Sequence, residues 1–508
     1  MGKLKEKVTK GFFWVLMEKC GIQAVHFAVT LVLARLLTPD DYGTVALLTI
    51  FIDVANVFVD SGFGRALVQK KTATQTDFNT VFYLSVAIAA LLYAGFFFAA
   101  PHIAGFYGIP DLCTMLRVLA LSLVFHSING VQNVELNRKM LFHLSFRISW
   151  VRVAVSSATG IGFALAGYGP WALVWSSLFG GIAGMVARQL VIRWRPALSF
   201  SWGSAREMFR FGWKVLAVSL IDRAYSNLQG ALIGKFYTRA DLAFVNKGRH
   251  VPNLVANLVS DSLRRVSFPA LAKMQDDPAR LRNAMRRMIR TASFFVFPVM
   301  TGLAVLAEPA VELLYGPRWL PIVPYLRLMC FAAVLRQADT VNRQAIMAMG
   351  RSDIALWLVI VRRALCITVM AFTLRLGVLV FFASVCLTVV PIGFFMNAVP
   401  NHRILRYTVG MQLSDMAAAT LLSAAAGGLL FASTLLPFPP ARMLLFQTLG
   451  FFGVYAALAL AFRPKVVGEI ASALLPIAKK RLGEGSAAVS LLARAAGPEG
   501  GGKEVRHG

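Results

Sequence analysis

Long apolar segments recur along the whole chain and alternate with short polar gaps. Examples are "FYLSVAIAALLYAGFFFAA" at 82–100 and "TLLSAAAGGLLFASTLLPF" at 420–438, neither of which carries a charge. A helix of roughly 20 apolar residues is long enough to cross a bilayer. The pattern predicts an all-α polytopic membrane protein with about fourteen transmembrane helices, at 13–35, 43–64, 79–100, 113–133, 147–166, 170–192, 211–233, 241–263, 291–313, 322–349, 354–374, 378–400, 413–436 and 443–462.

The composition agrees with a membrane protein, and the distribution of basic residues explains the high net charge. Hydrophobic residues make up 57% of the chain and charged residues 15%, where a soluble protein carries about 25%. A net charge of +28 would suit a nucleic-acid-binding protein. The basic residues, however, gather in alternate gaps between the apolar segments, which is the positive-inside pattern. No polar segment interleaves basic and aromatic residues as nucleic-acid surfaces do. We therefore expect no nucleic-acid partner.

The contrast between neighbouring gaps predicts the orientation in the membrane. The stretch "RRVSFPALAKMQDDPARLRNAMRRMIR" at 264–290 is rich in arginine, whereas "AGYGP" at 166–170 has no basic residue. Basic gaps stay in the cytoplasm, so both termini are predicted to be cytoplasmic. Because Asp276, Asp277 and Pro278 form a helix start signal, we expect a short surface helix within 264–290. Its arginines either set the topology or contact lipid phosphates.

An internal repeat divides the chain. The segments "LARLLTPDDYG" at 33–43 and "LIGKFYTRADLA" at 232–243 each join two predicted spans. One shift of 200 residues places Thr38 on Thr238, Asp41 on Asp241, Gly43 on Ala243, Arg65 on Arg265 and "GFFWVL" (11–16) beside "FGWKVL" (211–216). Transporters often consist of such repeats, with the substrate site between them. We predict two six-helix lobes around a central cavity, a final helix pair and a disordered cytoplasmic tail, at 1–200, 201–402, 403–463 and 464–508.

Charged residues lie inside several predicted spans. Lipid cannot solvate such a charge, so each one faces water or a partner. In 49–71, the spacing of Asp53, Asn56 and Asp60 places all three on one helix face. The predicted cationic set is Arg117, Arg152, Arg223, Lys247, Arg249, Arg336 and Arg363, and the predicted acidic set is Asp53, Asp222 and Asp339. Because cations outnumber acids, the sequence predicts a cationic cavity that binds an anion such as phosphate or pyrophosphate.

Structural alternatives to these roles stay open. Arg336 and Asp339 are spaced to form an ion pair within one helix, and Asp53 could pair with a cation instead of carrying a proton. Asp60 could form a salt bridge with Arg65 at the cytoplasmic end of its helix. His26 and His126, which lie in apolar segments, are either hydrogen-bonded residues between helices or proton relays.

Enzymatic motifs are missing from the sequence. It has no "GxxxxGK[ST]", no "GxSxG" and no "HExxH", and no long extramembrane domain to hold catalytic groups. The cysteines have no metal or redox spacing, so we interpret them as packing residues: Cys20, Cys113, Cys330, Cys366 and Cys386. We therefore predict a protein that is not an enzyme and binds no metal or organic cofactor.

Motifs along residues 10–400 resemble the polysaccharide exporters of the lipopolysaccharide and exopolysaccharide pathways. They occur in order with similar spacing: "LARLLTPDDYG", "FVDSGFGRALVQKK", "DFNTVFYLS", "GYGPWALV", "RWRP", "FPALAKMQDDPARLRNA", "GPRWLPIVPYLRLM" and "MGRSD". The chain thus resembles the Wzx-type flippases, which include the colanic-acid exporter, within the multidrug/oligosaccharidyl-lipid/polysaccharide exporter superfamily.

The resemblance implies a function and its partners. Such proteins move undecaprenyl-pyrophosphate-linked oligosaccharide across the bacterial inner membrane by alternating access. A proton or sodium gradient could drive the step, with Asp53, Asp222 or Asp339 as carrier. A polysaccharide polymerase and a chain-length regulator are expected to act beside the exporter. The alternatives are a peptidoglycan lipid-precursor flippase and a multidrug cation antiporter of the same fold; the antiporter would need an acidic cavity.

Overall fold

The structure is a computed structural model of the whole chain. It describes residues 21–60, 63–64, 67, 70, 73–139, 141–192, 194–433, 440–462, 466–469, 471 and 475. These residues are mostly helical, and none of them forms a strand. The prediction of an all-α protein is therefore confirmed for the part of the chain that the structure describes. Residues 13–20 of the first predicted span and most of the predicted tail lie outside these residues.

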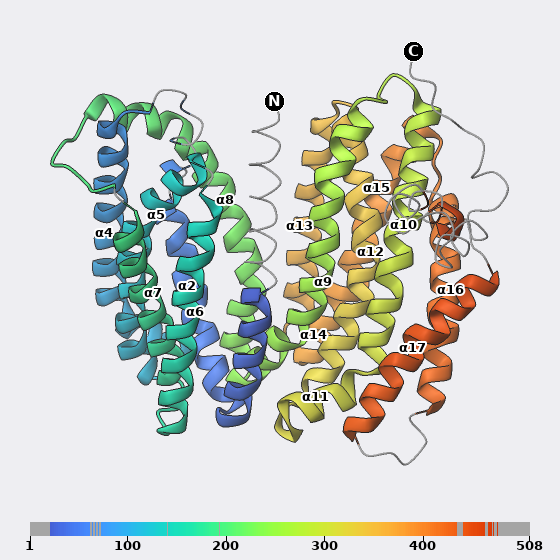
Figure 1. The fold of residues 1–508 in the computed structure, drawn as a ribbon, viewed down its shortest axis with the longest axis horizontal. Coiled ribbons are helices and arrows are strands. Elements are labelled where there is room, and N and C mark those ends of the chain that lie inside the picture. Colours follow the sequence, from blue (N-terminus) through green and yellow to red (C-terminus); the bar gives the residue numbers. More distant parts are fainter. Residues whose placement is uncertain are drawn as a thin grey trace. The chain divides into compact units, whose positions relative to one another are not determined.

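The helices follow one another with short connections (Figure 1). A helix at Gly21–Leu36 comes first. The others are α2 (Pro39–Asp60), α4 (Gln75–Tyr107), α5 (Asp111–Arg138), α6 (Phe142–Leu165), α7 (Trp171–Val191), α8 (Trp202–Phe236), α9 (Arg239–Ala272), α10 (Pro278–Val305), α11 (Ala307–Tyr315), the short η1 (Pro317–Trp319), α12 (Ile322–Ala348), α13 (Ser352–Thr373), α14 (Val378–Ser384), the π-helical η2 (Val385–Val389), α15 (Val390–Leu405), α16 (Val409–Ser433) and α17 (Pro440–Phe462).

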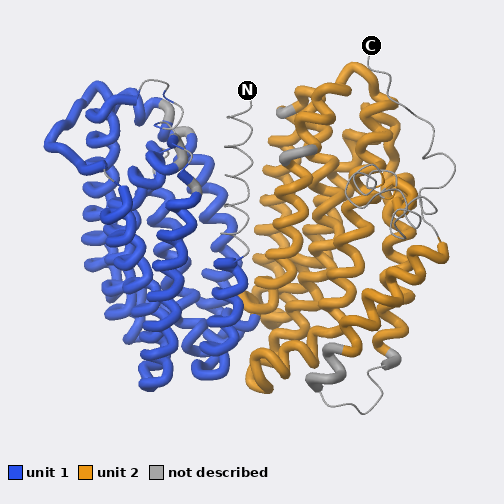
Figure 2. Tube along the Cα trace, viewed as in Figure 1, with its two compact units in different colours: residues 1–244 blue, residues 245–508 orange. Residues whose placement is uncertain are grey.

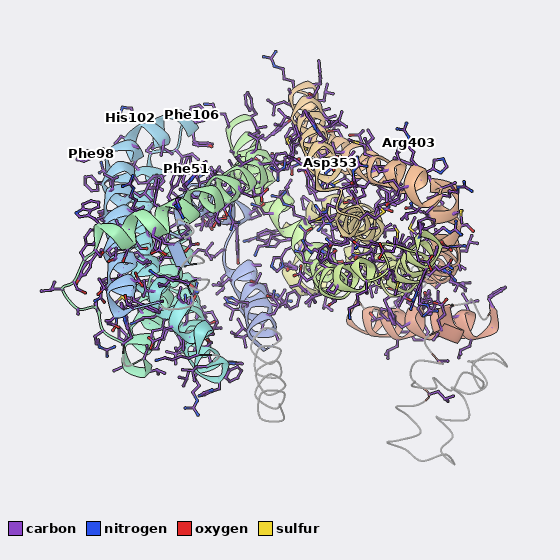
Figure 3. The ribbon with its side chains drawn as sticks, turned by 90° about the horizontal axis from the view of Figure 1, so that it is seen from above. Phe51, Phe98, His102, Phe106, Asp353 and Arg403 are labelled. Atoms are coloured by element: carbon purple, nitrogen blue, oxygen red, sulfur yellow. The ribbon has the colours of Figure 1, made fainter. Side chains whose placement is uncertain are left out.

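Eight helices among the described residues are long and apolar enough to cross a membrane. Their outer surfaces carry large apolar side chains: Phe98 on α4 is 74% exposed, and it lies with His102 and Phe106 along one side of that helix (Figure 3). Such a large apolar surface is unfavourable in water, whereas lipid solvates it. The chain is therefore a multi-pass membrane protein. Charged helices such as α12 fall outside the eight, since Arg336, Asp339 and Arg343 interrupt its apolar surface.

Two predicted boundaries are wrong. The predicted span 79–100 ends just before Pro101, but α4 continues through this proline to Tyr107. Proline lacks the backbone N–H and usually breaks a helix; a side chain described below compensates for it. The predicted span 291–313 is interrupted, because α10 ends at Val305 and α11 begins at Ala307.

The arginine-rich stretch 264–290 also differs from its prediction. Asp277 is the N-cap of α10, and its carboxylate accepts from the backbone N–H groups of Ala279 and Arg280, at 3.1 and 3.0 Å. The predicted start signal is thus confirmed. The helix that follows is not short, however, since α10 has 28 residues and continues into its apolar part.

The repeat is visible in two matching helix starts. At the beginning of α2 the Thr38 hydroxyl donates to Asp41 Oδ2 over 2.8 Å, and before α9 the Thr238 hydroxyl donates to Asp241 Oδ2 over 2.7 Å. Gly43 follows the first cap, and a Cβ there would lie 1.9 Å from the Arg239 carbonyl oxygen. The glycine therefore permits a close contact between α2 and the chain at Arg239.

The chain divides into two compact units, residues 1–244 and 245–508 (Figure 2). In unit 1, α8 packs on α2 and α4. The segment before α8 lies across the start of α4, where Asn79 Nδ2 donates to Ser199 Oγ over 2.7 Å and Trp194 Nε1 donates to Gln75 Oε1 over 3.1 Å. The unit boundary differs from the lobe boundary predicted at residue 200, and the predicted lobes stay a prediction.

The core of unit 2 is built where α10, α12, α15 and α16 meet. Leu281, Met285 and Ile289 recur at intervals of four residues on α10, and all three are fully buried. This spacing gives α10 one apolar face. Its arginines lie on the remaining surface, and two of them reach the partner helix α16.

Candidate functional site

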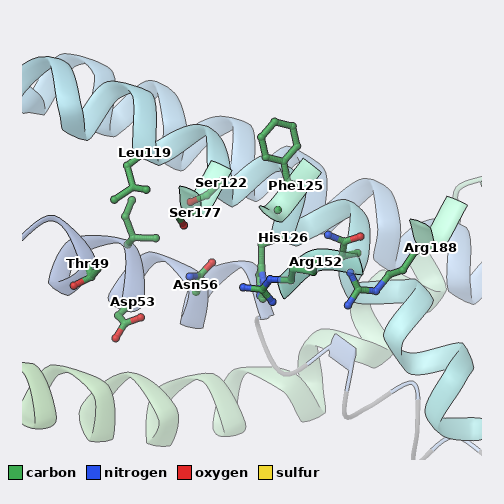
Figure 4. A pocket seen from close by; sticks show the side chains of 13 residues that line it. Thr49, Asp53, Asn56, Leu119, Ser122, Phe125, His126, Arg152, Ser177 and Arg188 are labelled. Atoms are coloured by element: carbon green, nitrogen blue, oxygen red, sulfur yellow. The ribbon is translucent and has the colours of Figure 1, made fainter. Parts of the chain in front are cut away.

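A polar pocket of about 280 Å³ opens among α2, α5, α6 and α7 of unit 1 (Figure 4). Thr49, Asp53 and Asn56 reach it from α2, and His126 and Asn129 reach it from α5. The other lining residues are Ile52, Leu119, Ser122, Phe125, Arg152, Ser177, Gly181 and Arg188. Ionisable and amide groups thus gather inside a bundle of otherwise apolar helices.

The polar face of α2 contacts neighbouring helices of unit 1. Asp53 Oδ2 lies 3.6 Å from an Arg223 guanidinium nitrogen of α8, and both side chains are about half exposed, at 45% and 49%. About two turns further along α2, Asp60 Oδ1 lies 2.9 Å from His126 Nε2 of α5. The predicted common face of Asp53, Asn56 and Asp60 therefore contacts α5, α8 and the pocket. The alternative partner Arg65 lies outside the described residues.

Arg152 and Arg188 supply the cationic side of the pocket. Arg188 of α7 donates through Nε to Asn133 Oδ1 over 3.2 Å and through a terminal nitrogen to the Gly184 carbonyl over 3.3 Å. Arg152 of α6 lines the same pocket and packs against Gly184. The sequence predicted Arg152 but missed Arg188, which lies near the end of an apolar helix where a topology role is the default interpretation.

Arg117 has a structural contact that the sequence prediction did not foresee. Its Nε donates to the Phe97 carbonyl over 3.1 Å, and its guanidinium carbon lies 4.2 Å from the centre of the Phe97 ring. Pro101 is four residues after Phe97 and has no N–H to donate to that carbonyl. Arg117 therefore replaces the hydrogen bond that the proline removes and stabilises the continued α4.

In unit 2 the structure brings together α12, α13 and α15 around Asp339. An Arg362 nitrogen lies 3.1 Å from Asp339 Oδ2, and Asn397 donates to the other carboxylate oxygen. The alternative of an ion pair between Arg336 and Asp339 is not seen. Arg336 donates instead to Asn257 Oδ1 over 3.4 Å. The sequence analysis singled out Arg363, which is the next residue and points about 100° away around the helix.

The remaining predicted residues occupy α8, α9 and α13. Lys247 and Arg249 are partly buried on α9, and Arg249 donates to Asn246 Oδ1 over 2.9 Å. Asp222 is exposed on α8, and Arg363 is partly buried on α13. The structure places none of these four among the residues that line the pocket of unit 1. Their roles stay predictions.

A second ionic cluster, which the sequence analysis missed, joins α10 to α16. Asp415 is nearly buried and accepts from Arg286 over 2.8 and 3.0 Å, from the Tyr407 hydroxyl over 2.9 Å, and lies 3.2 Å from Arg290 Nε. Burial raises the pKa of the Tyr407 phenol, so it stays a hydrogen-bond donor at neutral pH. Arg290 also lies 3.4 Å from Glu469. The cluster holds helices together.

A further clamp fixes the polar edge of unit 1. Lys70 Nζ lies 3.1 Å from Asp77 Oδ1 and 2.8 Å from Glu207 Oε2. The hydrogen bond to Glu207 is the main reason that the pKa of Lys70 is raised. Within the described residues no group of His, Cys, Asp and Glu side chains is arranged to hold a metal ion.

Solved structures with this fold are membrane transporters. A structure of the lipid II flippase MurJ in an inward closed conformation aligns with a TM-score of 0.72 and 13% sequence identity, covering 89% of this chain and 98% of that one. An inward-facing multidrug resistance MATE family transporter of the MOP superfamily aligns with a TM-score of 0.57 and 13% identity, covering 76% and 96%. The chain therefore has the fold of this transporter superfamily.

The family follows from the sequence comparison. The profile of the family described as "Polysaccharide biosynthesis protein" matches residues 32–324, which is more than half of the chain. The chain belongs to this family, and the resemblance seen in its motifs is confirmed.

Individual relatives are similar over most of their length. The teichuronic acid biosynthesis protein TuaB of Bacillus subtilis is 23% identical over 366 residues, 70% of this chain and 74% of TuaB. The lipopolysaccharide biosynthesis protein WzxC of Escherichia coli is 25% identical over 360 residues, covering 69% and 72%. The succinoglycan biosynthesis transport protein ExoT of Rhizobium meliloti is 22% identical over 355 residues, covering 70% and 72%.

Proposed function

We propose that this protein is a flippase that moves an undecaprenyl-pyrophosphate-linked oligosaccharide across the bacterial inner membrane during surface polysaccharide biosynthesis. The observation that carries the proposal is the family match over residues 32–324. The names of three relatives, for teichuronic acid, lipopolysaccharide and succinoglycan, refer to different polymers of the cell surface. What such polymers share is a lipid-linked precursor, so we assign the common carrier lipid to this chain and leave the sugar open.

The proposed architecture has fourteen crossings, in two six-helix lobes around a cavity and a final helix pair. Two observations support it: a helix overlaps each predicted apolar segment, and the Thr38 and Thr238 caps repeat at the expected offset. The alternation of basic gaps supports cytoplasmic termini. We assign no catalytic step to the chain, and propose a polymerase and a chain-length regulator as its neighbours in the pathway.

The proposed mechanism is alternating access with ion coupling. Basic side chains neutralise the pyrophosphate while the glycan enters a hydrated cavity, and the polyprenyl tail stays in lipid. Among the acids, Asp339 already has Arg362 and Asn397 as partners. Asp53 has only a long contact to Arg223 and is half exposed. Asp53 is therefore the better candidate to carry a proton or Na⁺.

A second candidate substrate is the peptidoglycan lipid precursor. The observation that favours it is the TM-score of 0.72 to MurJ, whose structure is described as that of a lipid II flippase. Both substrates carry a pyrophosphate, so the same cationic groups would serve either one. A multidrug cation antiporter is disfavoured, because arginines and lysines outnumber acids among the intramembrane residues.

The test is a flipping assay in liposomes. Purified protein is reconstituted with a fluorescent undecaprenyl-pyrophosphate oligosaccharide, and the label that becomes accessible on the opposite leaflet is followed with and without a proton or sodium gradient. We expect translocation well above that of protein-free liposomes. A parallel sample with fluorescent lipid II separates the two substrates. The proposal is contradicted if several oligosaccharide lipids stay in their leaflet under every gradient.

A further inference from the structure

The two halves of the chain hold a matched pair of arginines. Arg152 of α6 and Arg362 of α13 are 210 positions apart. Each packs against a glycine on a later helix: a Cβ at Gly184 would lie 3.5 Å from the Arg152 side chain, and one at Gly393 would lie 2.8 Å from Arg362 Cδ. In both halves the missing side chain leaves the room in which the arginine lies.

A second pair at the same offset supports the correspondence. Arg327 of α12 lies 210 positions after Arg117 of α5. Arg327 Nε donates over 3.1 Å to the Ala304 carbonyl in the last turn of the preceding α10, as Arg117 Nε does to Phe97 of α4. Both pairs indicate that α5 and α6 correspond to α12 and α13 at an offset of 210 residues.

The matched arginines have different surroundings. In unit 2, Arg362 is neutralised by Asp339, which Asn397 holds in place. The residue 210 positions before Asp339 is Asn129, which carries no charge. No salt bridge joins Arg152 to an acidic side chain among the described residues of unit 1, and Asp53, the carboxylate that lines the same pocket, lies 3.6 Å from Arg223 of α8. Instead, Arg152 and Asn129 line an open pocket of about 280 Å³.

The pocket has the groups that an anionic, hydroxyl-bearing ligand needs. Arg188 adds a second guanidinium, and the hydroxyls of Ser122 and Ser177 can donate. The side-chain oxygens of Asn56 and Asn129 are buried without a hydrogen-bond partner. They can accept from sugar hydroxyls, or the amides can rotate and donate to phosphate oxygens. A volume below the usual range of about 300–1,000 Å³ for ligand pockets fits a phosphate-bearing group and excludes a whole oligosaccharide.

We propose that the pocket of unit 1 is a binding site for a phosphate-ester anion, which takes beside Arg152 the place that the Asp339 carboxylate occupies beside Arg362. This inference rests on the proposed function, since the pyrophosphate of a lipid-linked sugar would be its natural ligand. A guanidinium without a counter-charge inside a membrane protein has an unfavourable free energy. A bound anion neutralises it, but only while the substrate is bound. Arg152 thus binds substrate, whereas Arg362 belongs to a permanent pair.

The test is calorimetric titration of the full-length protein in detergent at fixed ionic strength. One arm uses inorganic pyrophosphate and the other uses geranyl pyrophosphate, so that a free anion and a lipid headgroup are distinguished. Arg152→Gln should weaken binding at least tenfold. Arg147→Gln is the matched control, because Arg147 is exposed on the same helix and does not line the pocket; its affinity should equal that of the wild type.

A second variant keeps the test decisive if Arg152→Gln does not fold. Asn129→Asp provides the carboxylate that unit 2 already has, so it should pair with Arg152 and also weaken binding at least tenfold. Binding in either arm that depends on Arg152 and Asn129 supports the site, and binding in the geranyl arm alone assigns it to the lipid headgroup. Unchanged affinity in both variants, or an equal loss in Arg147→Gln, overturns it. If the wild type flips the lipid but these variants bind normally, the site fails and the flippase stands.

Discussion

Unit 1 and unit 2 each have an arginine in the middle of a helix, and the surroundings of the two arginines differ. Arg362 in unit 2 has a carboxylate partner from α12. Arg152 in unit 1 faces an open polar pocket that contains Asn129 at the matching position. A permanent partner stabilises a helix bundle, whereas an open cationic pocket can exchange a ligand. At these matched positions unit 2 has a closed ion pair, whereas unit 1 has an open polar pocket.

The largest effect is expected for the ionic cluster of unit 2, which has no counterpart around the pocket of unit 1. Asp415→Ala removes the common partner of Arg286, Arg290 and Tyr407. Arg290 keeps Glu469, whereas Arg286 loses the carboxylate that it contacts. Breaking a buried pair costs about 3–5 kcal/mol, so the melting temperature in detergent should fall sharply. Asp353→Ala is the control, since its partner Arg351 is on the surface. Equal melting temperatures for the two variants would contradict the role of the cluster.

The next effect separates the matched arginines directly. Arg362→Gln leaves Asp339 without its cation and should cost about 1–3 kcal/mol, reduced from the fully buried value because Arg362 is one-third exposed. Arg152→Gln removes a guanidinium without an acidic partner and should change stability by less than about 0.5 kcal/mol. Thermal unfolding, followed by tryptophan fluorescence, measures both. If Arg152→Gln were the more destabilising variant, the two arginines would not differ as proposed.

Sequence reasoning found the features that depend on local chemistry. Apolar segment length predicted the helices, and the Asp277 cap followed from residue type and spacing. It missed features that depend on partners far along the chain. Helical periodicity gives the face of a residue but not what packs against that face, so the contact between Arg362 and Asp339 was not predicted. The continuation of α4 past Pro101 was equally hidden, because its explanation is a side chain from α5.

A smaller effect is expected for the arginines that donate to a backbone carbonyl of a preceding helix, Arg117 to Phe97 and Arg327 to Ala304. Arg117→Gln and Arg327→Gln should each cost about 1 kcal/mol, the usual value of one hydrogen bond. The first loss has a specific rescue, since Pro101→Ala restores a backbone N–H that can donate to the Phe97 carbonyl. The double variant should therefore recover the melting temperature of Pro101→Ala alone. A full additive loss in the double variant would show that Arg117 does not compensate for the proline.

The smallest effect concerns the two repeated caps. Thr38→Val and Thr238→Val each remove a hydroxyl that bonds the aspartate three residues later. Loss of an N-terminal cap costs about 0.5–2 kcal/mol, and the two variants should be equal because the caps have the same geometry. Hydrogen exchange at the first turns of α2 and α9 provides the measurement. Strongly unequal losses would indicate that the two helix starts are not equivalent.

The most direct test of the difference between the units is an electron cryo-microscopy structure of the full-length protein with undecaprenyl pyrophosphate. We predict density for the phosphate groups within hydrogen-bond distance of the Arg152 guanidinium, beside Asn129 and Arg188, while the Arg362–Asp339 pair stays closed. Phosphate density that lies away from Arg152, or that displaces Asp339 from Arg362, would contradict the account.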